Sequence, residues 1–457
     1  MSEKNIPLVS VYIVNHNYGE YLETAIESVL SQTLKNFEII FIDNGSSDDS
    51  KERVKKYFEN KKIKFIFQKN LGLNAANNVA LKFSKGKYLI RLDADDYFDK
   101  NALEILSSKL ERDKNIGLVF PDYYTVDKEG EIIDMIRRHD FSEVTLLDQP
   151  AHGACSMLRR EILLALDGYD ESYHCQDGWD LWIRFIKKFG VGNINLPLFF
   201  YRDHGKNLTK DKSKILSTRA KIFKKNSKKK IDHKSIAVIP IRGSLVDDSS
   251  VALKKLGKKL VIDWTIDSAL KSSHISEVFV TTPDKKIIQH LRKKYSKKVK
   301  IITREVNLAR FGVNIDVTLT DLFENIKNEI NDFSILCLLY IEYPFRGSKY
   351  IDMAIDAMEV FNTKRVISMQ SMDKKFYTHS GKGMVPVHKS FYLKQENQQF
   401  FSEAGGIYVI KRGSMFRDTP KDYKIGHIDV DDLAALNIST KYNWELGSIF
   451  AKKNEEF

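Results

Sequence analysis

Three carboxylates lie close together just past an apolar run near residue 90. Segment 91–96 reads RLDADD and follows the strand expected at 88–92. A loop at the carboxyl end of a buried strand presents its side chains at the edge of the sheet. Asp93 and Asp95, separated by one residue, could together hold a hard divalent cation and reach a ribose hydroxyl. Such spacing is common by chance, and a solvated acidic loop is the alternative.

Strands and helices alternate around this loop. Apolar runs predict strands at 8–14, 37–42, 63–67 and 88–92, and helical spacing predicts helices at 21–30 and 74–83. This alternation predicts a doubly wound sheet whose ligands lie beyond the carboxyl ends of its strands. The acidic loop therefore falls where a ligand is expected. A cation there would bridge a diphosphate and neutralise the charge that builds on it as it leaves.

Length and composition limit the classes of protein that fit. At roughly 100–200 residues per domain, 457 residues predict two or three domains. Hydrophobic residues make up 42% and charged residues 29%, which excludes a fully disordered chain. No apolar run approaches the ~18 residues that span a bilayer, and the first residues lack a signal-peptide pattern. Cys155, Cys175 and Cys337 have no metal-binding spacing, so we expect a cytoplasmic protein with idle thiols.

The formal net charge of +12 is concentrated in one segment. Residues 206–234 contain twelve Lys and Arg residues against two Asp residues, and the rest of the chain is nearly neutral. Interleaved aromatic residues for base stacking are absent, which argues against a nucleic-acid partner. Apolar residues at 215, 216, 222 and 223 share one helical face. This segment could be a helix lying peripherally on an anionic membrane or a solvated connecting helix.

The alternation of strands and helices restarts beyond the basic segment. Strands are predicted at 235–240, 278–282, 333–339 and 366–369, with a helix at 260–270. The sequence thus predicts two α/β domains, residues 1–205 and 235–457. Residues 206–234 form a Lys-rich linker between them.

The order of short motifs in the first domain resembles that of family 2 glycosyltransferases, which have the GT-A fold. The motifs stand at 9–17, 25–33, 37–47, 70–72, 91–96, 153–160, 168–171, 176–182 and 201–204. They cover nearly the whole first domain in the order of the family. The resemblance implies an inverting transfer from a nucleotide-diphosphate sugar to a hydroxyl group, with Mg²⁺ or Mn²⁺ as cofactor.

The resemblance also implies roles for acidic residues. Asp93 would contact the ribose of the nucleotide and help at the metal, which Asp95 would hold. Asp177 matches the general base, which would remove the acceptor hydroxyl's proton while that oxygen attacks the anomeric carbon. The alternative for Asp177 is the N-cap of a helix at 179–185. His204 follows the Tyr-Arg pair that ends the family core; it either assists the metal or the diphosphate, or is structural.

The remaining donor-site residues depart in part from the family. Val14, His16 and Asn44 lie where the family docks the nucleotide base. The family often has Asp at position 44, and because an amide can accept or donate, the base is left open. Asn77 stands where many members carry an Arg that helps to hold the diphosphate, which leaves more of that charge to the metal. Segment 153–160 either borders the acceptor site or forms a core strand.

From Ile236 to about Asn437 the chain resembles the cytidylyltransferases that activate sialic-acid-like sugars as CMP derivatives. The matching segments are 239–244, 256–261, 281–284, 343–346, 404–408 and 428–432. The resemblance implies a second Rossmann-like domain, of nucleotidyltransferase type. It identifies Arg242, Ser244 and Asp429 as the remains of that site.

The departures in this second domain fall on the residues that would do the chemistry. Leu245 stands at the first Lys of the family's phosphate loop, and a Lys-Asn pair is replaced by the acidic segment 247–250. A triphosphate needs cations and bare backbone donors, so these changes would repel it. The metal-binding Asp-Ile-Asp of the family has His427 in place of its first carboxylate. We expect a retained fold with lost or strongly altered nucleotidyl transfer.

Three hypotheses about function remain open from the sequence. The first is a transferase that builds lipopolysaccharide, capsule or a similar surface glycan, with the second domain as a binding or assembly module. The second is a bifunctional enzyme whose second domain also activates a nonulosonic acid with CTP. The third is a non-catalytic sugar-binding scaffold. A lipid-linked acceptor would bring the protein to the inner face of the cell membrane, and domains like the second one often pair into homo-oligomers.

Overall fold

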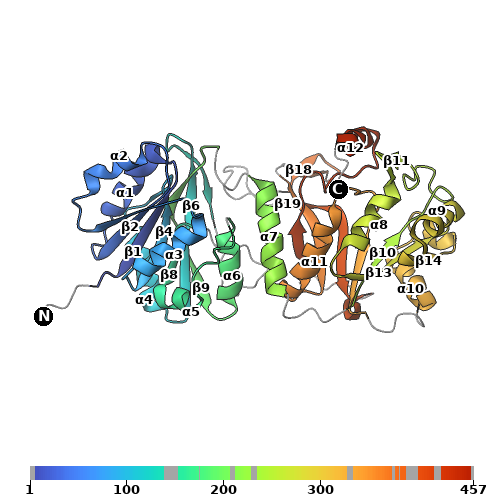
Figure 1. Ribbon diagram of the computed structural model, residues 1–457, viewed down its shortest axis with the longest axis horizontal. Coiled ribbons are helices and arrows are strands. Elements are labelled where there is room, and N and C mark those ends of the chain that lie inside the picture. The colour runs from blue at the N-terminus through green and yellow to red at the C-terminus, as the bar shows by residue number, and fades with distance from the viewer. Residues whose placement is uncertain are drawn as a thin grey trace. The chain divides into compact units, whose positions relative to one another are not determined.

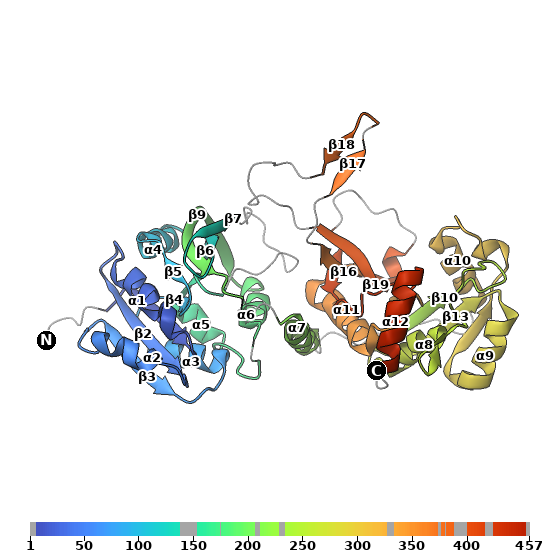
Figure 2. The same cartoon turned by 90° about the horizontal axis from the view of Figure 1, so that it is seen from above.

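The computed structural model of the chain contains two compact units, the first ending at Thr218 and the second beginning at Arg219 (Figure 1). The structure describes residues 6–137, 153–173, 175–205, 211–227, 234–326, 333–372, 376–379, 381–387, 400–415 and 424–453. β17 (Tyr377–His379) and β18 (Met384–Pro386) pair as an antiparallel hairpin (Figure 2). This hairpin is part of the first unit. None of the helices in these ranges has the length and apolar character required to cross a membrane.

The N-terminal unit is built on one mixed sheet. Its strands are β1 (Val9–Asn15), β2 (Phe37–Asn44), β3 (Ile63–Gln68), β4 (Tyr88–Asp93), β5 (Tyr97–Phe98), β6 (Ile116–Val126), β7 (Ile132–Ile136), β8 (Met157–Arg159) and β9 (Gly190–Arg202). The strand order is β3-β2-β1-β4-β8-β6-β9-β5, with β7 paired to β6. The first four strands are mutually parallel, whereas β8 runs antiparallel to both β4 and β6. The four strands predicted for this domain are confirmed, each within one or two residues at its ends.

Helices cover both faces of this sheet because successive residues of a strand point to opposite faces. Val11 and Ile13 of β1 pack in one apolar core with Ile26 of α1, whereas Tyr12 packs in a second core with Ala80 of α3. The helices are α1 (Leu22–Leu30), α2 (Ser50–Val54), α3 (Leu73–Phe83), α4 (Ala102–Arg112), α5 (Arg160–Ala165) and α6 (Asp177–Ile186), with 3₁₀ turns at Gly19–Tyr21 and Lys55–Tyr57. The buried parallel strands therefore hold their carboxyl ends rigidly at one edge.

The C-terminal unit is a second α/β structure. Its main sheet has the order β14-β13-β10-β15-β19-β16-β20, and β19 runs antiparallel to both of its neighbours. The strands are β10 (Ser235–Pro240), β13 (Ile275–Thr282), β14 (Lys300–Thr303), β15 (Ile335–Leu339), β16 (Arg365–Met372), β19 (Phe400–Lys411) and β20 (Gly426–Asp429), beside a small hairpin of β11 (Lys255–Leu256) and β12 (Lys259–Leu260). The helices are α8 (Val261–Lys271), α9 (Lys285–Tyr295), α10 (Ile315–Ile326), α11 (Gly347–Phe361) and α12 (Lys441–Lys453).

Helix α7 (Lys212–Ser227) occupies the segment that the sequence predicts to be a basic linker, and the unit boundary falls inside it. Its second half belongs to the C-terminal unit. There the ring of Phe223, which is 1% exposed, packs 5.2 Å from the ring of Phe361 on α11. Ser227 Oγ donates a hydrogen bond to Asp356 on the same helix. The apolar face that could have met a membrane is therefore covered by protein at this end.

Candidate active site

The carboxyl ends of β1, β2, β3 and β4 meet at one edge of the N-terminal sheet because these strands are parallel. The register aligns Val14 of β1 with Asp93 of β4, and Asn44 of β2 with Gln68 of β3. His16 follows β1 directly and is exposed. The structure thus brings the predicted base-docking residues and the start of the acidic loop to one edge, as expected for ligand sites in such sheets.

Asp95 and His204 form a direct contact at this edge. His204 Nε2 lies 3.0 Å from Asp95 Oδ2, and the two side chains are only 6% and 10% exposed. The imidazole ring is held between aromatic neighbours, with its centroid 5.4 Å from that of Tyr18 and 5.7 Å from that of Tyr21. Two residues separated by more than 100 positions in the chain therefore converge on one spot.

Asp93 is more open than Asp95. It ends β4, and its side chain is 27% exposed. Its Oδ1 lies 3.0 Å from Nε of the buried Arg91, which fixes the carboxylate while leaving part of it accessible. An oriented, partly accessible carboxylate is suited to accept a hydrogen bond from a ligand hydroxyl.

Arg202 and Asp96 stabilise the acidic loop; both stand in the sequence motifs, but neither was predicted to have a role at the site. The guanidinium of Arg202 donates from Nε to the carbonyl of Asp95 at 2.9 Å, and its backbone N–H donates to Asp96 Oδ1 at 2.8 Å. Burial beside Asp95 and Asp93 raises the pKa of Asp96 well above its usual range. Arg202 ends β9 two residues before His204, so its hydrogen bonds connect the segment that leads to the histidine with the loop that carries the carboxylates.

Tyr18 is a further neighbour that the sequence did not single out. It is partly buried, and burial together with the charges of Asp95 and Asp93 raises its pKa. Its hydroxyl therefore stays protonated at neutral pH and can act as a hydrogen-bond donor. The sequence feature that could have indicated Tyr18 is its position in the loop after β1, at the edge of the sheet where ligands are expected.

The side chain of Asn44 is hydrogen-bonded to β3 and to the loop that follows it. We call the loops at this edge of the sheet the rim of the candidate site. Its Nδ2 donates to Asn70 Oδ1 at 3.2 Å and to the carbonyl of Gly72 at 3.4 Å. Its Oδ1 accepts from Gln68 Nε2 at 2.9 Å and from the backbone N–H of Leu71 at 3.2 Å. Only 4% of the residue is exposed. A base that used this amide would have to displace one of these partners.

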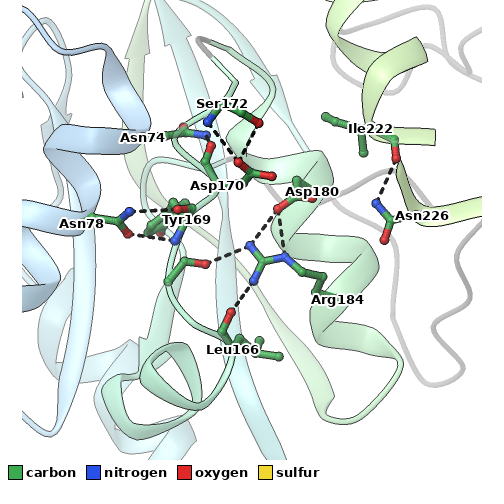
Figure 3. A network of polar contacts seen from close by, with 11 residues as sticks. Asn74, Asn78, Leu166, Tyr169, Asp170, Ser172, Asp180, Arg184, Ile222 and Asn226 are labelled. Carbon is green, nitrogen blue, oxygen red and sulfur yellow. Dashed lines mark hydrogen bonds and ion pairs between the residues drawn. The ribbon is translucent and has the colours of Figure 1, made fainter. Parts of the chain in front are cut away.

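Asn77 and Asp177 belong to helices α3 and α6. Asn77 is fully buried, and its neighbours Asn74 and Asn78 donate to the carbonyls of Asp170 and Tyr169, at 2.6 and 2.8 Å (Figure 3). These bonds join α3 to the loop that leads into α6.

Asp177 is the first residue of α6, and its side chain lies outside the described residues. The N-cap alternative for Asp177 is wrong, because the N-cap position is occupied by Gln176 in a left-handed conformation (φ 61°). An acidic residue in the first helical turn is still favoured by the helix dipole.

Segment 153–160 approaches the acidic loop through the main chain. The N–H of Cys155 donates to the carbonyl of Arg91 at 2.9 Å, and β8 then pairs with β4. Cys155 is buried and has a positive φ of 59°. The core-strand alternative is confirmed for β8, whereas the acceptor-site alternative stays a prediction.

The predicted remnant site of the C-terminal unit is not gathered in one place. Ser244 donates to Asp284 Oδ2 from both its backbone N–H and its hydroxyl, at 2.9 and 3.1 Å. Asp429 instead pairs with Arg219, on β20 at the edge of the sheet. Arg242 follows β10, which β15, β19 and β16 separate from β20, and it stacks 4.4 Å from the ring centroid of Phe311.

The N-terminal site fits a divalent cation in its donor types. Asp95 and His204 offer an oxygen and a nitrogen 3.0 Å apart, and Asp93 supplies further oxygens at the end of β4. Among the described residues, no group of three or more His, Cys, Asp or Glu side chains is arranged to hold a metal unaided. A cation bound here would therefore take part of its coordination from ligand oxygens, as Mg²⁺ usually does.

The N-terminal unit is thus a mixed α/β domain of GT-A-like type, with acidic residues at the carboxyl edge of its parallel strands. Residues 10–166 match the family model for glycosyl transferase family 2. An uncharacterized glycosyltransferase of Methanocaldococcus jannaschii is 34% identical over 194 residues, which cover 41% of this chain and 67% of that protein. The chain therefore belongs to glycosyl transferase family 2.

Other similar proteins are much longer or more distant. Chondroitin synthase of Escherichia coli is 34% identical over 131 residues, 28% of this chain and 19% of that protein. The chain thus spans about a fifth of the length of that synthase. The crystal structure of S. aureus TarS residues 1–349 with UDP-GlcNAc matches 48% of this chain and 66% of that chain, with 17% identity and a TM-score of 0.41.

Proposed function

We propose that this protein is a metal-dependent, inverting glycosyltransferase that moves a sugar from a nucleotide-diphosphate sugar to a hydroxyl group of a surface glycan. The observation that carries the proposal is the contact between Asp95 and His204 beside Asp93, at the carboxyl edge of the parallel strands. Similarity to chondroitin synthase supports a glycan as the product.

The chain's own residues would divide the work at the donor diphosphate. Mg²⁺ or Mn²⁺ held by Asp95, with Asp93 and His204 beside it, would neutralise charge on the leaving diphosphate. Asp93 would accept a hydrogen bond from a ribose hydroxyl, and Tyr18 would donate one toward the negative charge. Val14 and His16 would border the base, whereas Asn44 and Asn77 would act by shaping the rim and α3.

Asp177 is our candidate for the general base. Its place at the start of α6, in the segment tied to α3 through Asp170 and Tyr169, supports this role. As a base it would take the proton of the acceptor hydroxyl as that oxygen attacks the anomeric carbon from the face opposite the diphosphate. Inversion at the anomeric carbon follows from that geometry.

A donor screen by thermal shift, with Mn²⁺ present, tests the proposal without requiring the acceptor. A ligand that binds only the folded state raises the apparent melting temperature according to its affinity. We expect one or more of the common UDP-, GDP- or dTDP-linked sugars to raise it, and Asp95→Asn to abolish the metal-dependent part. Asp113→Asn, at the end of α4, is the matched control and should respond like wild type. Equal shifts in wild type and Asp95→Asn would refute the metal assignment.

Asp177 is tested separately by turnover. Asp177→Asn should still give the donor-induced thermal shift but lose transfer by a factor of about 10²–10⁴, the usual contribution of a general base. A variant that loses the thermal shift as well would contradict the assignment of Asp177 as base. Linkage analysis of the product by NMR would check inversion.

For the C-terminal unit we propose a binding or assembly role without nucleotidyl transfer. Asp284 takes the Ser244 N–H that a phosphate would need, and the neighbouring Leu245 is 60% exposed where a cation would be required. Incubation of the full chain with CTP, Mg²⁺ and a nonulosonic acid should release no pyrophosphate. Release of pyrophosphate would favour the bifunctional alternative.

A further inference from the structure

A strongly basic surface with exposed aromatic side chains covers one edge of the N-terminal sheet. Residues 51–69 contain eight Lys and Arg residues against two Glu residues. All eight cationic side chains are exposed. The segment runs from α2 through the 3₁₀ turn at Lys55–Tyr57 to β3, the terminal strand of the sheet. We call it the basic aromatic edge.

Three phenylalanines form a ridge on this edge. Phe58 is 44% exposed and Phe67 is 43% exposed, unusually open for such large apolar side chains. Phe65 lies between them, with ring centroids 4.9 Å from Phe58 and 6.5 Å from Phe67. It also contacts Phe41 of the core at 5.6 Å, so the ridge is anchored to the sheet. Lys51 Nζ lies 5.4 Å above the ring of Phe67 and places a positive charge beside the apolar ridge.

The positive charge and the ring packing of this edge distinguish between the binding partners that could cover the ridge. A second copy of the same edge would bring two strongly positive surfaces together, which is unfavourable. A nucleic-acid base would need free ring faces, but Phe58 and Phe65 meet edge to face and Lys51 covers Phe67. A bilayer with anionic headgroups offers negative charge to the lysines and an apolar boundary to the exposed rings.

We propose that the basic aromatic edge binds the surface of an anionic membrane, with Phe58 and Phe67 entering the headgroup boundary. This assigns membrane contact to the N-terminal unit in place of helix α7, whose Phe223 is already packed on Phe361. The carboxyl end of β3 leads through Gln68 and Asn70 into the rim of the candidate active site. Binding by this edge therefore brings that rim close to the lipid surface.

Co-sedimentation of the full chain with vesicles tests the proposal. Wild type should bind vesicles of phosphatidylcholine with phosphatidylglycerol, bind phosphatidylcholine alone far more weakly, and dissociate at high salt. Phe58→Ser with Phe67→Ser should lower the partition coefficient about tenfold or more, because apolar area is lost from the contact. Lys51→Gln with Lys61→Gln should also lower it about tenfold or more.

Matched changes in the C-terminal unit serve as controls. Lys293→Gln with Lys297→Gln removes two exposed charges near the end of α9, and Tyr442→Ser removes a 75% exposed ring from α12. Both should bind like wild type. Because the substituted side chains are exposed, melting temperatures should stay close to that of wild type, and the donor-induced thermal shift should persist in every variant.

Three results would overturn the proposal. The first is equal binding to neutral and anionic vesicles. The second is equal loss in the control variants. The third is that the Phe58→Ser, Phe67→Ser variant binds vesicles like wild type but changes from dimer to monomer in light scattering. That result would identify the edge as an interface between two copies of the chain. A missing donor shift in wild type would instead count against the proposed function alone.

Discussion

Replacing Arg202 by Met should loosen the acidic loop more than any exposed arginine could. The Arg202 guanidinium donates to the carbonyl of Asp95 at 2.9 Å and to those of Asp127 and Lys128 at 3.2 and 2.8 Å. It also lies over the ring of Tyr21, 4.8 Å from the centroid. The residue is 4% exposed, so its guanidinium lies away from bulk solvent.

The magnitude follows from the three carbonyls left without a donor. Hydrogen bonds from a charged group contribute about 1.5–3 kcal/mol each, and their losses are not fully additive. We expect Arg202→Met to lower the free energy of unfolding of the N-terminal unit by about 3–5 kcal/mol. Arg202→Lys should recover part of it, since one donor remains. Arg53→Met, which removes an exposed pair with Asp49, should cost less than about 1 kcal/mol.

Hydrogen exchange with mass spectrometry separates local loosening from a general loss of stability. Peptides covering residues 91–98 and 126–130 should lose protection first in Arg202→Met, and the metal-dependent thermal shift should weaken in parallel. Hydrogen-exchange protection of residues 91–98 equal to that of wild type would refute this prediction. A loss of protection spread evenly over the whole unit would also refute it.

The structure supports three further predictions. Asn44→Ala leaves Gln68 and the N–H of Leu71 without their hydrogen-bond acceptor, and should lower the free energy of unfolding by about 1–3 kcal/mol. An unchanged midpoint in urea titrations would show that these bonds do not stabilise the unit. The hydrogen bond to Asp356 raises the pKa of His274, so the stabilisation from this pair is fully present below the unfolded pKa and is lost as pH rises through the folded one. His274→Gln should flatten the stability profile at pH values above the ordinary histidine pKa of about 6.5, and an unaltered profile would refute this prediction. Gly243→Ala should destabilise the C-terminal unit by about 1–3 kcal/mol, because φ is +72° and a Cβ would lie 2.5 Å from Asp284 Cβ; calorimetry showing wild-type stability would exclude that clash.

The buried parallel strands could be predicted because their apolar runs are continuous and local. The β4 prediction placed Asp93 at the edge of the sheet, and the acidic loop followed from it. His204 was within reach of sequence reasoning only through family resemblance, since its contact with Asp95 spans more than 100 residues. Nothing in the local pattern indicates that the two meet.

The supporting residues could not be predicted for a related reason. Arg202 acts through backbone carbonyls, which every residue has, so no residue type signals its partners. Nothing in the sequence indicates that the amide of Asn44 is already hydrogen-bonded, but in the structure it bonds to Asn70 and Leu71 in the loop after β3. The direction of β19 is likewise set by pairing with β15 and β16, which lie far apart in the chain.

The amides around the candidate site have a thermodynamic consequence. Asn15 donates to Asp43 and Ser46, and Asn17 accepts from Ser47. Asn44 donates to Asn70 and to the carbonyl of Gly72, just before α3. These cross-links fix the loops after three strands before any ligand binds. Association then needs little additional ordering of the chain, so more of the interaction energy remains as affinity. If the proposed donor is bound here, discrimination between nucleotide bases would depend on the rigidity of these loops, and loss of any one of these hydrogen bonds should broaden the range of nucleotides accepted.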